Sequence, residues 1–252
     1  MLDAKRITHG LRILAVAAFA ALIPVFLITF SVRAVVNLPW LYSYGYDEFE
    51  GQIKYYLDIE RDDYLSAGRQ IRDYFNDDAE FIVIDVPVGG IRMVNLFNER
   101  EILHMVDVKS LVRGVYRLSE VSGAYLLAFA LVGFALRRRE FLPRLGKFAA
   151  MGGVSTLALG ALVGLGSLVG FDRLFLFFHE VSFSNDLWQL DPRRDYLIAM
   201  FPQGFFFFAT VLIAGSVVVQ AILLAAVPTL LLRCATRRAE KRRSERPADS
   251  VA

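Results

Sequence analysis

The sequence predicts a mainly α-helical membrane protein, a four-transmembrane-helix bundle with an extracytoplasmic α+β cap that contains a β-hairpin. Three observations predict this class. Of the 252 residues, 56% are hydrophobic, whereas an average soluble chain has roughly 45–50% apolar residues. The excess is gathered in four largely uncharged stretches, and about 20 apolar residues suffice to cross a bilayer as a helix. The lysines and arginines beside these stretches form three sets, which four crossings bring to one side of the membrane.

The predicted spans cover about residues 13–33, 119–136, 148–169 and 207–232. The second is short for a crossing, so residues on its amino-terminal side extend it. The last uncharged stretch begins before residue 207 and is too long for one straight span. Its proline and its run of four phenylalanines indicate that the beginning lies in the membrane interface. Residues 1–252 are therefore expected to form a single, multi-pass membrane domain.

The orientation follows from the positive charges in the short flanks. Basic residues precede the first span, fill the loop 137–147 between the second and third, and follow the fourth. These segments, and with them both termini, are predicted to lie in the cytoplasm. The loops 34–118 and 170–206 then lie outside, and acidic residues outnumber basic ones in the first of them.

The tail 239–252 is rich in charge and poor in apolar residues, so it is predicted to be disordered. Positive charge beside the end of a membrane helix is typical of an anchor to anionic lipid. We therefore expect no nucleic-acid partner for this chain.

The large outer loop has local patterns of its own. β-Branched and aromatic residues at 81–86, turn residues at 87–90 and a second apolar run at 91–97 predict the hairpin. Apolar residues at helical spacing predict a helix over 63–75. Asn98 stands where a helix N-cap would, and Glu101 follows three residues later, as in a capping box. This pair predicts a helix that begins at the end of the hairpin and continues toward the second span.

The third span is rich in glycine. The pairs Gly160/Gly164 and Gly166/Gly170 have the small-xxx-small spacing that lets helices approach closely in lipid. Packing within the bundle is the favoured interpretation, ahead of a dimer interface.

Two of the three histidines, His104 and His179, are predicted to lie on the outer face, whereas His9 lies in the cytoplasmic leader. Imidazole can take up and release a proton near neutral pH, so a pair of histidines suits acid–base catalysis. Hydrogen-bonded surface histidines would produce the same pattern. Carboxylates accompany both residues, and the spacing places Arg100, Glu101 and Asp107 on the helical face of His104.

Other chemistries find less support in the sequence. A zinc site needs three or four ligands, and the only cysteine, Cys234, is predicted at the inner end of the last span. The outer serines stand in no G-x-S-x-G elbow, and neither a phosphate loop nor a dinucleotide fingerprint is present. We therefore expect no metal and no cofactor.

Two segments carry a resemblance to a known family. They are Asn98-Glu-Arg-Glu-Ile-Leu-His-Met-Val-Asp-Val-Lys109 and Phe178-His-Glu-Val-Ser-Phe-Ser-Asn-Asp-Leu-Trp-Gln-Leu-Asp-Pro192, the latter continuing toward Pro202. With them the chain resembles the bacterial integral membrane proteins that include the lipoprotein intramolecular transacylase Lit. The second motif is the more specific, through its aromatic, Asn-Asp and Trp spacing.

The resemblance implies an acyltransferase in the bacterial cytoplasmic membrane, with its active site on the outer face. The substrate would be a diacylglyceryl-modified lipoprotein with a free α-amine on its N-terminal cysteine. The sn-2 acyl chain would move to this amine and leave a lyso-form lipoprotein, with membrane lipid as the other partner. By the same resemblance His104 and His179 are catalytic. The supporting or substrate-orienting positions are Arg100, Glu101, Asp107, Lys109, Asn185, Asp186 and Trp188.

Elementary chemistry is compatible with this reaction and with two alternatives. Amine and ester lie in one molecule, and good intramolecular alignment supplies about 7–11 kcal/mol of the barrier. No enzyme nucleophile is then required, only a base for the amine and an acid for the departing alkoxide. The alternatives are an outer-face lipid ester hydrolase, in which the same pair activates water, and a non-enzymatic membrane sensor or scaffold.

Overall fold

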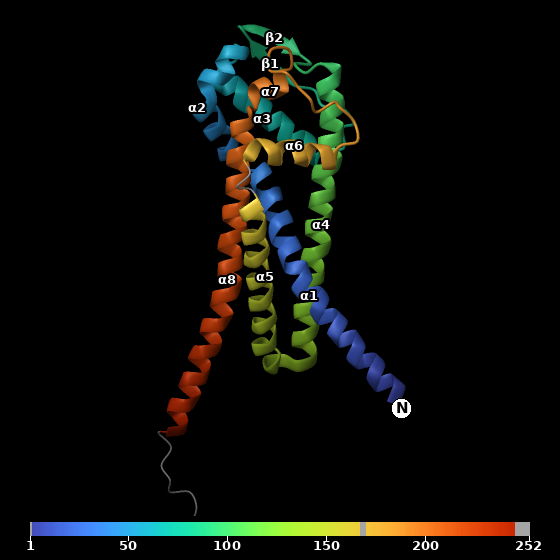
Figure 1. Ribbon diagram of the computed structural model, residues 1–252, viewed down its shortest axis with the longest axis vertical. Helices are drawn as coiled ribbons and strands as arrows, with labels where there is room; N and C mark the ends of the chain where they lie inside the picture. Colours follow the sequence, from blue (N-terminus) through green and yellow to red (C-terminus); the bar gives the residue numbers. More distant parts are fainter. Residues whose placement is uncertain (1, 167–169, 245–252) are drawn as a thin grey trace, which may run out of the picture. The chain divides into compact units, whose positions relative to one another are not determined.

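The computed structural model describes residues 2–166 and 170–244. It is mainly helical and contains one two-stranded hairpin, so the predicted class is confirmed in both respects (Figure 1). The elements in chain order are α1 (Leu2–Val36), α2 (Pro39–Tyr56), α3 (Arg61–Asn76), β1 (Asp85–Val88), β2 (Ile91–Val94), α4 (Glu99–Arg137), the 3₁₀ turn η1 (Arg138–Glu140), α5 (Leu142–Gly166), α6 (Phe171–Ser182), α7 (Tyr196–Met200) and α8 (Gln203–Ser244).

The chain forms two units by its internal contacts. The first unit combines Met1–Ile28, Ser119–Leu162 and Ser216–Ala252, and the second combines Thr29–Leu118 and Val163–Gly215. The first unit is built from parts of α1, α4, α5 and α8. Its buried core joins Phe19, Ile23 and Leu27 of α1 to Val217 and Ala221 of α8.

Three helical stretches of the described residues are long and apolar enough to cross a membrane. They are His9–Val36, Glu99–Glu140 and Gln203–Cys234. The third predicted span, 148–169, falls on α5, which is not among the three; residues 167–169 of that span lie outside the described residues. The fourth crossing therefore stays a prediction, and with it the placement of the outer cap.

The second unit is organised around a buried aromatic and aliphatic core. Tyr64, Ile53, Ile59, Ile84 and Met200 have almost no exposed surface. The helix predicted over 63–75 is present as α3, and its apolar stripe faces this core. Burial of such side chains is worth about 1.5–3 kcal/mol each, which makes this stripe the main reason for the helix to dock.

The hairpin is present, but its turn is shorter than predicted. Pro87 and Val88 belong to β1, and the turn consists of Gly89 and Gly90 alone, with φ angles of 57° and 76°. A two-residue turn of this type needs positive φ at both central positions, which glycine adopts without strain. Pro87 is tolerated because each strand of a two-stranded ribbon is an edge, where one backbone N–H can be missing.

Sequence patterns missed α2 and misjudged the tail. In α2 a proline occupies the first helical turn, where its missing N–H does no harm, but charged residues interrupt the apolar stripe. In the tail, α8 continues to Ser244, so residues 239–244 are helical and not disordered. The Ala, Glu, Lys and Arg residues there are good helix formers and extend a helix that already exists. Residues 245–252 lie outside the described residues.

Only one glycine of each predicted pair has described surroundings, so the pairs stay a prediction. A Cβ atom at Gly160 or Gly170 would meet nothing within 4 Å, and the side-chain surroundings of Gly164 and Gly166 lie outside the description. A close approach between backbones is found about two turns before Gly160 on α5. A Cβ atom at Gly153 would lie 2.6 Å from the Ala221 carbonyl oxygen of α8, so backbone meets backbone there.

Replacing Gly153 by alanine should therefore destabilise the first unit. Since the atoms in the way belong to the α8 backbone, the helices must separate, which costs about 1–3 kcal/mol. Gly160→Ala is the matched control, because the space is open and alanine favours a helix by up to about 1 kcal/mol. Thermal unfolding in detergent should show a lower Tm for Gly153→Ala only. Equal Tm values for the two variants would contradict this packing.

Candidate active site

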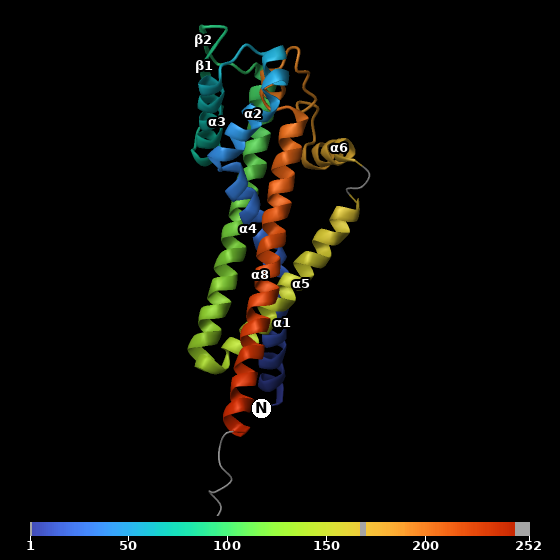
Figure 2. The ribbon, with the colours of Figure 1, turned by 90° about the vertical axis from the view of Figure 1, so that its left-hand side faces the viewer.

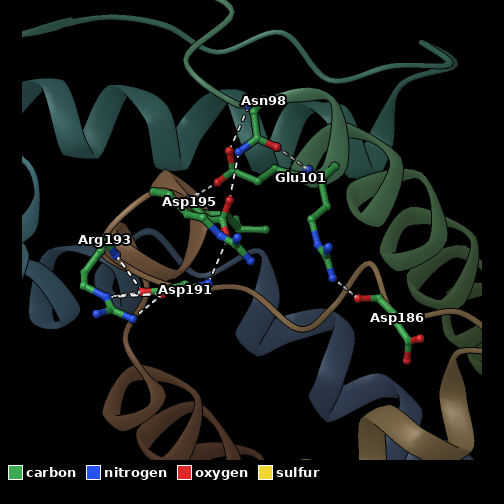
Figure 3. Close-up of polar contacts among 9 residues, drawn as sticks. Asn98, Glu101, Asp186, Asp191, Arg193 and Asp195 are labelled. Carbon is green, nitrogen blue, oxygen red and sulfur yellow. Dashed lines mark hydrogen bonds and ion pairs between the residues drawn. The ribbon is translucent and has the colours of Figure 1, made fainter.

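The predicted capping box at the start of α4 is confirmed, and its Glu101 side chain is fully buried. The Asn98 side-chain oxygen accepts the Glu101 backbone N–H at 3.1 Å, and the Glu101 carboxylate accepts the Asn98 backbone N–H at 2.8 Å. The second carboxylate oxygen of Glu101 accepts the backbone N–H of Leu197 at 2.5 Å. The cap thereby joins α4 to the first turn of α7, which is remote in sequence (Figure 3).

Asp195 extends this network. One of its oxygens accepts the Asn98 side-chain amide at 2.9 Å, and the other accepts the Asp191 backbone N–H at 2.7 Å. Asp195 itself is only 2% exposed. The Asp191 carboxylate is in turn held by the Arg193 guanidinium at 2.6 Å. The segment 191–197 is thus fastened to the beginning of the helix that carries His104 (Figure 3).

His104 and His179 lie close together and come from two different helices of the second unit. His104 lies on α4, one turn beyond Glu101, and His179 lies on α6; both are buried. Their ring centroids are 6.3 Å apart. Phe183 lies 5.1 Å from the His104 ring, and Trp188 lies 5.1 Å from the His179 ring. The two histidines that sequence patterns placed on one face therefore share one aromatic environment.

A cavity of about 640 Å³ adjoins both histidines. Apolar side chains from α6, α7 and α8 form one part of its wall, and polar side chains from 186–191 form another. This mixture suits a ligand with an apolar chain and a polar head. The residues that line it are His104, Phe175, Leu176, His179, Glu180, Asp186, Trp188, Gln189, Leu190, Asp191, Leu197, Ile198 and Phe206.

The two rings differ in their hydrogen bonds. The Nδ1 atom of His179 lies 2.7 Å from the carbonyl oxygen of Phe175. A carbonyl can only accept, so this nitrogen carries the proton and leaves the lone pair on Nε2. In contrast, Nδ1 of His104 is buried and finds no hydrogen-bond partner among the described residues.

Burial shifts the pKa values of three groups in this region, all of which lie in the predicted outer loops 34–118 and 170–206. It lowers the pKa of His104 to about 4, helped by the neighbouring His179. It also lowers the pKa of His179, against the effect of the Phe175 carbonyl. It raises the pKa of Glu101 to about 7, although backbone donors oppose this. Both histidines are therefore neutral at neutral pH, and each keeps one ring nitrogen unprotonated.

Of the other predicted supporting residues, Asn185, Asp107, Arg100 and Asp186 come together. The Asn185 amide donates to the Asp107 carboxylate at 2.8 Å, and the Arg100 guanidinium donates to the Asp186 carbonyl oxygen. These two contacts hold the segment after α6 against α4. Trp188 follows directly and reaches the cavity.

Lys109 lies elsewhere. Its ammonium group binds the Asp77 carboxylate at 3.0 Å and the Ala79 carbonyl oxygen at 2.6 Å, and it sits 3.9 Å above the Tyr74 ring. It joins α4 to the segment after α3 and does not line the cavity. Glu101 does not line the cavity either, but it fixes residues that do.

Sequence patterns missed most of the apolar wall. Phe175, Leu197, Ile198 and Phe206 come from three separate helices. One signal was available for Phe175, because it stands one helical turn before His179. Among the described residues, no group of three or more His, Cys, Asp or Glu side chains is placed to hold a metal ion.

The model of the family "Lipoprotein intramolecular transacylase Lit" matches residues 17–206. The chain belongs to this family. Solved structures of the membrane integral lipoprotein intramolecular transacylase Lit from Bacillus cereus are also similar to it, with TM-scores of 0.69, 0.70 and 0.71. They share 19–20% identity with it, over 91–96% of this chain and 99% of theirs.

Two of these structures carry a substitution of one histidine, by arginine in one and by alanine in the other. At this identity the likeness to the Lit structures shows a common fold. None of the curated proteins matches the sequence. Membership of the Lit family makes the chain a relative of transacylases that act on lipoproteins, and its three apolar helices are compatible with a membrane protein.

The buried, neutral state of His104 predicts a pH-dependent stability. Folded His104 takes up a proton near pH 4, whereas an unfolded histidine does so near 6.5. Between these values the unfolded chain binds more protons, so the free energy of unfolding falls as the pH falls. In His104→Gln this loss between about pH 7 and pH 5 should be smaller by about 1–2 kcal/mol.

Thermal unfolding in detergent at the two pH values measures this difference. His9→Gln is the control, since His9 is exposed, and it should follow the unsubstituted protein. The same acid loss in His104→Gln as in the unsubstituted protein would show that His104 is not held neutral by burial.

Proposed function

We propose that this chain is a lipoprotein intramolecular transacylase at the outer face of the bacterial cytoplasmic membrane, with four crossings and both termini inside. It moves the sn-2 acyl chain of a diacylglyceryl-cysteine to the α-amine of the same cysteine. Family membership supports the reaction class. The observation that carries the proposal is the pair of neutral histidines on one cavity with an apolar and a polar wall.

The cavity provides for both parts of this substrate. Phe175, Leu197, Ile198 and Phe206 offer an apolar surface to an acyl chain or to the glyceryl carbons. The carboxylates of Glu180 and Asp186 lie on the same cavity and favour a cationic α-ammonium group. A confined head group is held close to its own ester, and this proximity replaces the encounter of two molecules.

The hydrogen bonds of the rings suggest their roles. Nε2 of His179 has its lone pair free, so it takes a proton from the attacking amine, whose ammonium form has a pKa near 8. His104 lines the same cavity, 6.3 Å from the His179 ring, so it takes the second proton from the reacting nitrogen and passes it to the departing glyceryl oxygen. When the amide forms, the ammonium group has lost two protons. One ends on the glyceryl hydroxyl and the other goes to solvent.

Both histidines should be needed for turnover. His104→Ala and His179→Ala should each lower the rate by about 10²–10⁴, since a positioned acid or base contributes this much. The double variant should lose less than the product of the two factors, because the residues act as a unit. His9→Ala is the matched control and should keep full activity. Near-normal turnover in either single variant, with normal membrane insertion, removes that residue from catalysis.

The reaction itself is tested by expression in a bacterium that has diacylated lipoproteins but no N-acyltransferase. The N-terminal lipopeptide should keep its mass, because the transfer is internal, while its fragments show an N-acylated cysteine and a monoacyl glyceryl group. Mild base, which cleaves esters and spares amides, should then remove one chain instead of two.

Three other outcomes would each contradict the proposal. A third acyl chain would mean that the donor is a separate phospholipid. Loss of one chain with a free amine would identify a lipid ester hydrolase. An unaltered lipopeptide beside well-expressed protein would favour a sensor or scaffold.

A further inference from the structure

Helix α6 presents two different kinds of surface besides its buried side. Phe175 and His179 face inward. On the outside, Phe177, Phe178 and Val181 are 61%, 47% and 68% exposed, and they form one apolar strip at helical spacing. A large apolar strip that is left exposed marks a surface for a partner or for lipid.

The remaining exposed face of α6 is mostly polar, apart from Leu176, which lines the cavity. It carries Asp172, Arg173 and Glu180, which the helical spacing places together. A helix with one apolar and one charged outer face is typical of a helix that lies in the plane of a membrane interface.

The neighbours of α6 indicate the level of that interface. The Phe171 ring, at the start of α6, lies 5.2 Å from the ring of Phe207 on α8. The next residue of α8, Phe208, stacks on Tyr44 at 3.9 Å and lies 5.9 Å from the half-exposed Trp40. Tryptophan and tyrosine are enriched where membrane helices leave the hydrocarbon. All these contacts fall within the first two turns of the apolar stretch Gln203–Cys234.

The orientation of the α6 axis agrees with a position in the membrane interface. Within the second unit it runs across α8 and α4 and not along them, as two perpendicular views show (Figure 1 and Figure 2). A helix that crosses a membrane-spanning helix at its aromatic end lies parallel to the bilayer surface. Its whole length then stays at one depth.

We propose that α6 lies in the membrane–water interface, with Phe177, Phe178 and Val181 inserted among lipid acyl chains. The occupant of the apolar strip is therefore the bilayer. Interfacial helices are buried about 5–10 Å into the boundary between head groups and acyl chains. His179 on the inner side of the same helix is thereby held at the depth of a lipid's glyceryl esters, so the ester need not leave the bilayer. This last step rests on the proposed transacylase function.

Spin labels on single cysteines measure the depth of α6 without reference to activity. In a Cys234→Ser background, labels are placed by Phe177→Cys and Val181→Cys, with Arg173→Cys on the polar face as control. Val219→Cys, on the exposed side of α8, serves as the lipid reference. The protein is reconstituted in vesicles of phosphatidylethanolamine and phosphatidylglycerol.

Labels at residues 177 and 181 should collide more with oxygen than with a water-soluble nickel chelate. The label at residue 219 should do so too, and its depth in the bilayer should be greater. The label at residue 173 should show the reverse. Labels at 177 and 181 that are as wet as the one at 173 would overturn the proposal. So would labels shielded from both reagents, because a protein partner or a second copy would then cover the strip.

The link to catalysis is tested separately. Phe177→Asp/Val181→Asp should lower turnover of a diacylglyceryl lipopeptide embedded in a bilayer by about tenfold or more, because two apolar anchors are lost. Turnover of the same lipopeptide in detergent micelles should change little, and Arg173→Gln should affect neither. An equal loss in both presentations would overturn the role of depth in catalysis. Inactivity of the unsubstituted protein would instead refute the proposed reaction and leave the depth result standing.

Discussion

The buried carboxylate of Glu101 is the interaction on which the site depends. It caps α4 and at the same time holds Leu197, and with Asn98 and Asp195 it fixes the wall segment 191–198. Burial raises its pKa to about 7, so keeping it charged is unfavourable although backbone donors surround it. An apolar side chain would avoid this cost but could not accept two N–H groups. The carboxylate therefore sets the position of the wall and not the stability of a core.

From this fixed point the geometry of the histidine pair follows. His104 is one helical turn from Glu101, so its ring position is set by the same cap that sets the wall. The ring of His179 is oriented by the Phe175 carbonyl of its own helix. The low dielectric that keeps both rings neutral also strengthens any hydrogen bond that a ligand makes to them. A site without an enzyme nucleophile relies on such positioning, because the reacting groups belong to the substrate.

Local patterns predicted what local forces determine. Asn98 and Glu101 form their box, Gly89 and Gly90 turn the hairpin, and α3 buries its stripe as expected. What these patterns left open depends on distant partners. Lys109 was assigned from the family motif. It stands five residues after His104, so its side chain points away from that ring, and it binds Asp77. The apolar wall of the cavity assembles from α6, α7 and α8, so no spacing within one segment could reveal it. The glycine contact on α5 also required knowledge of which face meets α8.

The two histidines are thus held by different means. His104 belongs to a helix whose start is locked in a polar network, whereas His179 belongs to a helix whose outer strip is apolar and exposed. A helix of 12 residues has little stability by itself, so α6 depends on its environment for its position. If lipid covers that strip, the bilayer holds one half of the catalytic pair and the protein the other. The distance between the rings then becomes a property of the protein in its membrane. A soluble scaffold with the same residues would lack one of the two supports.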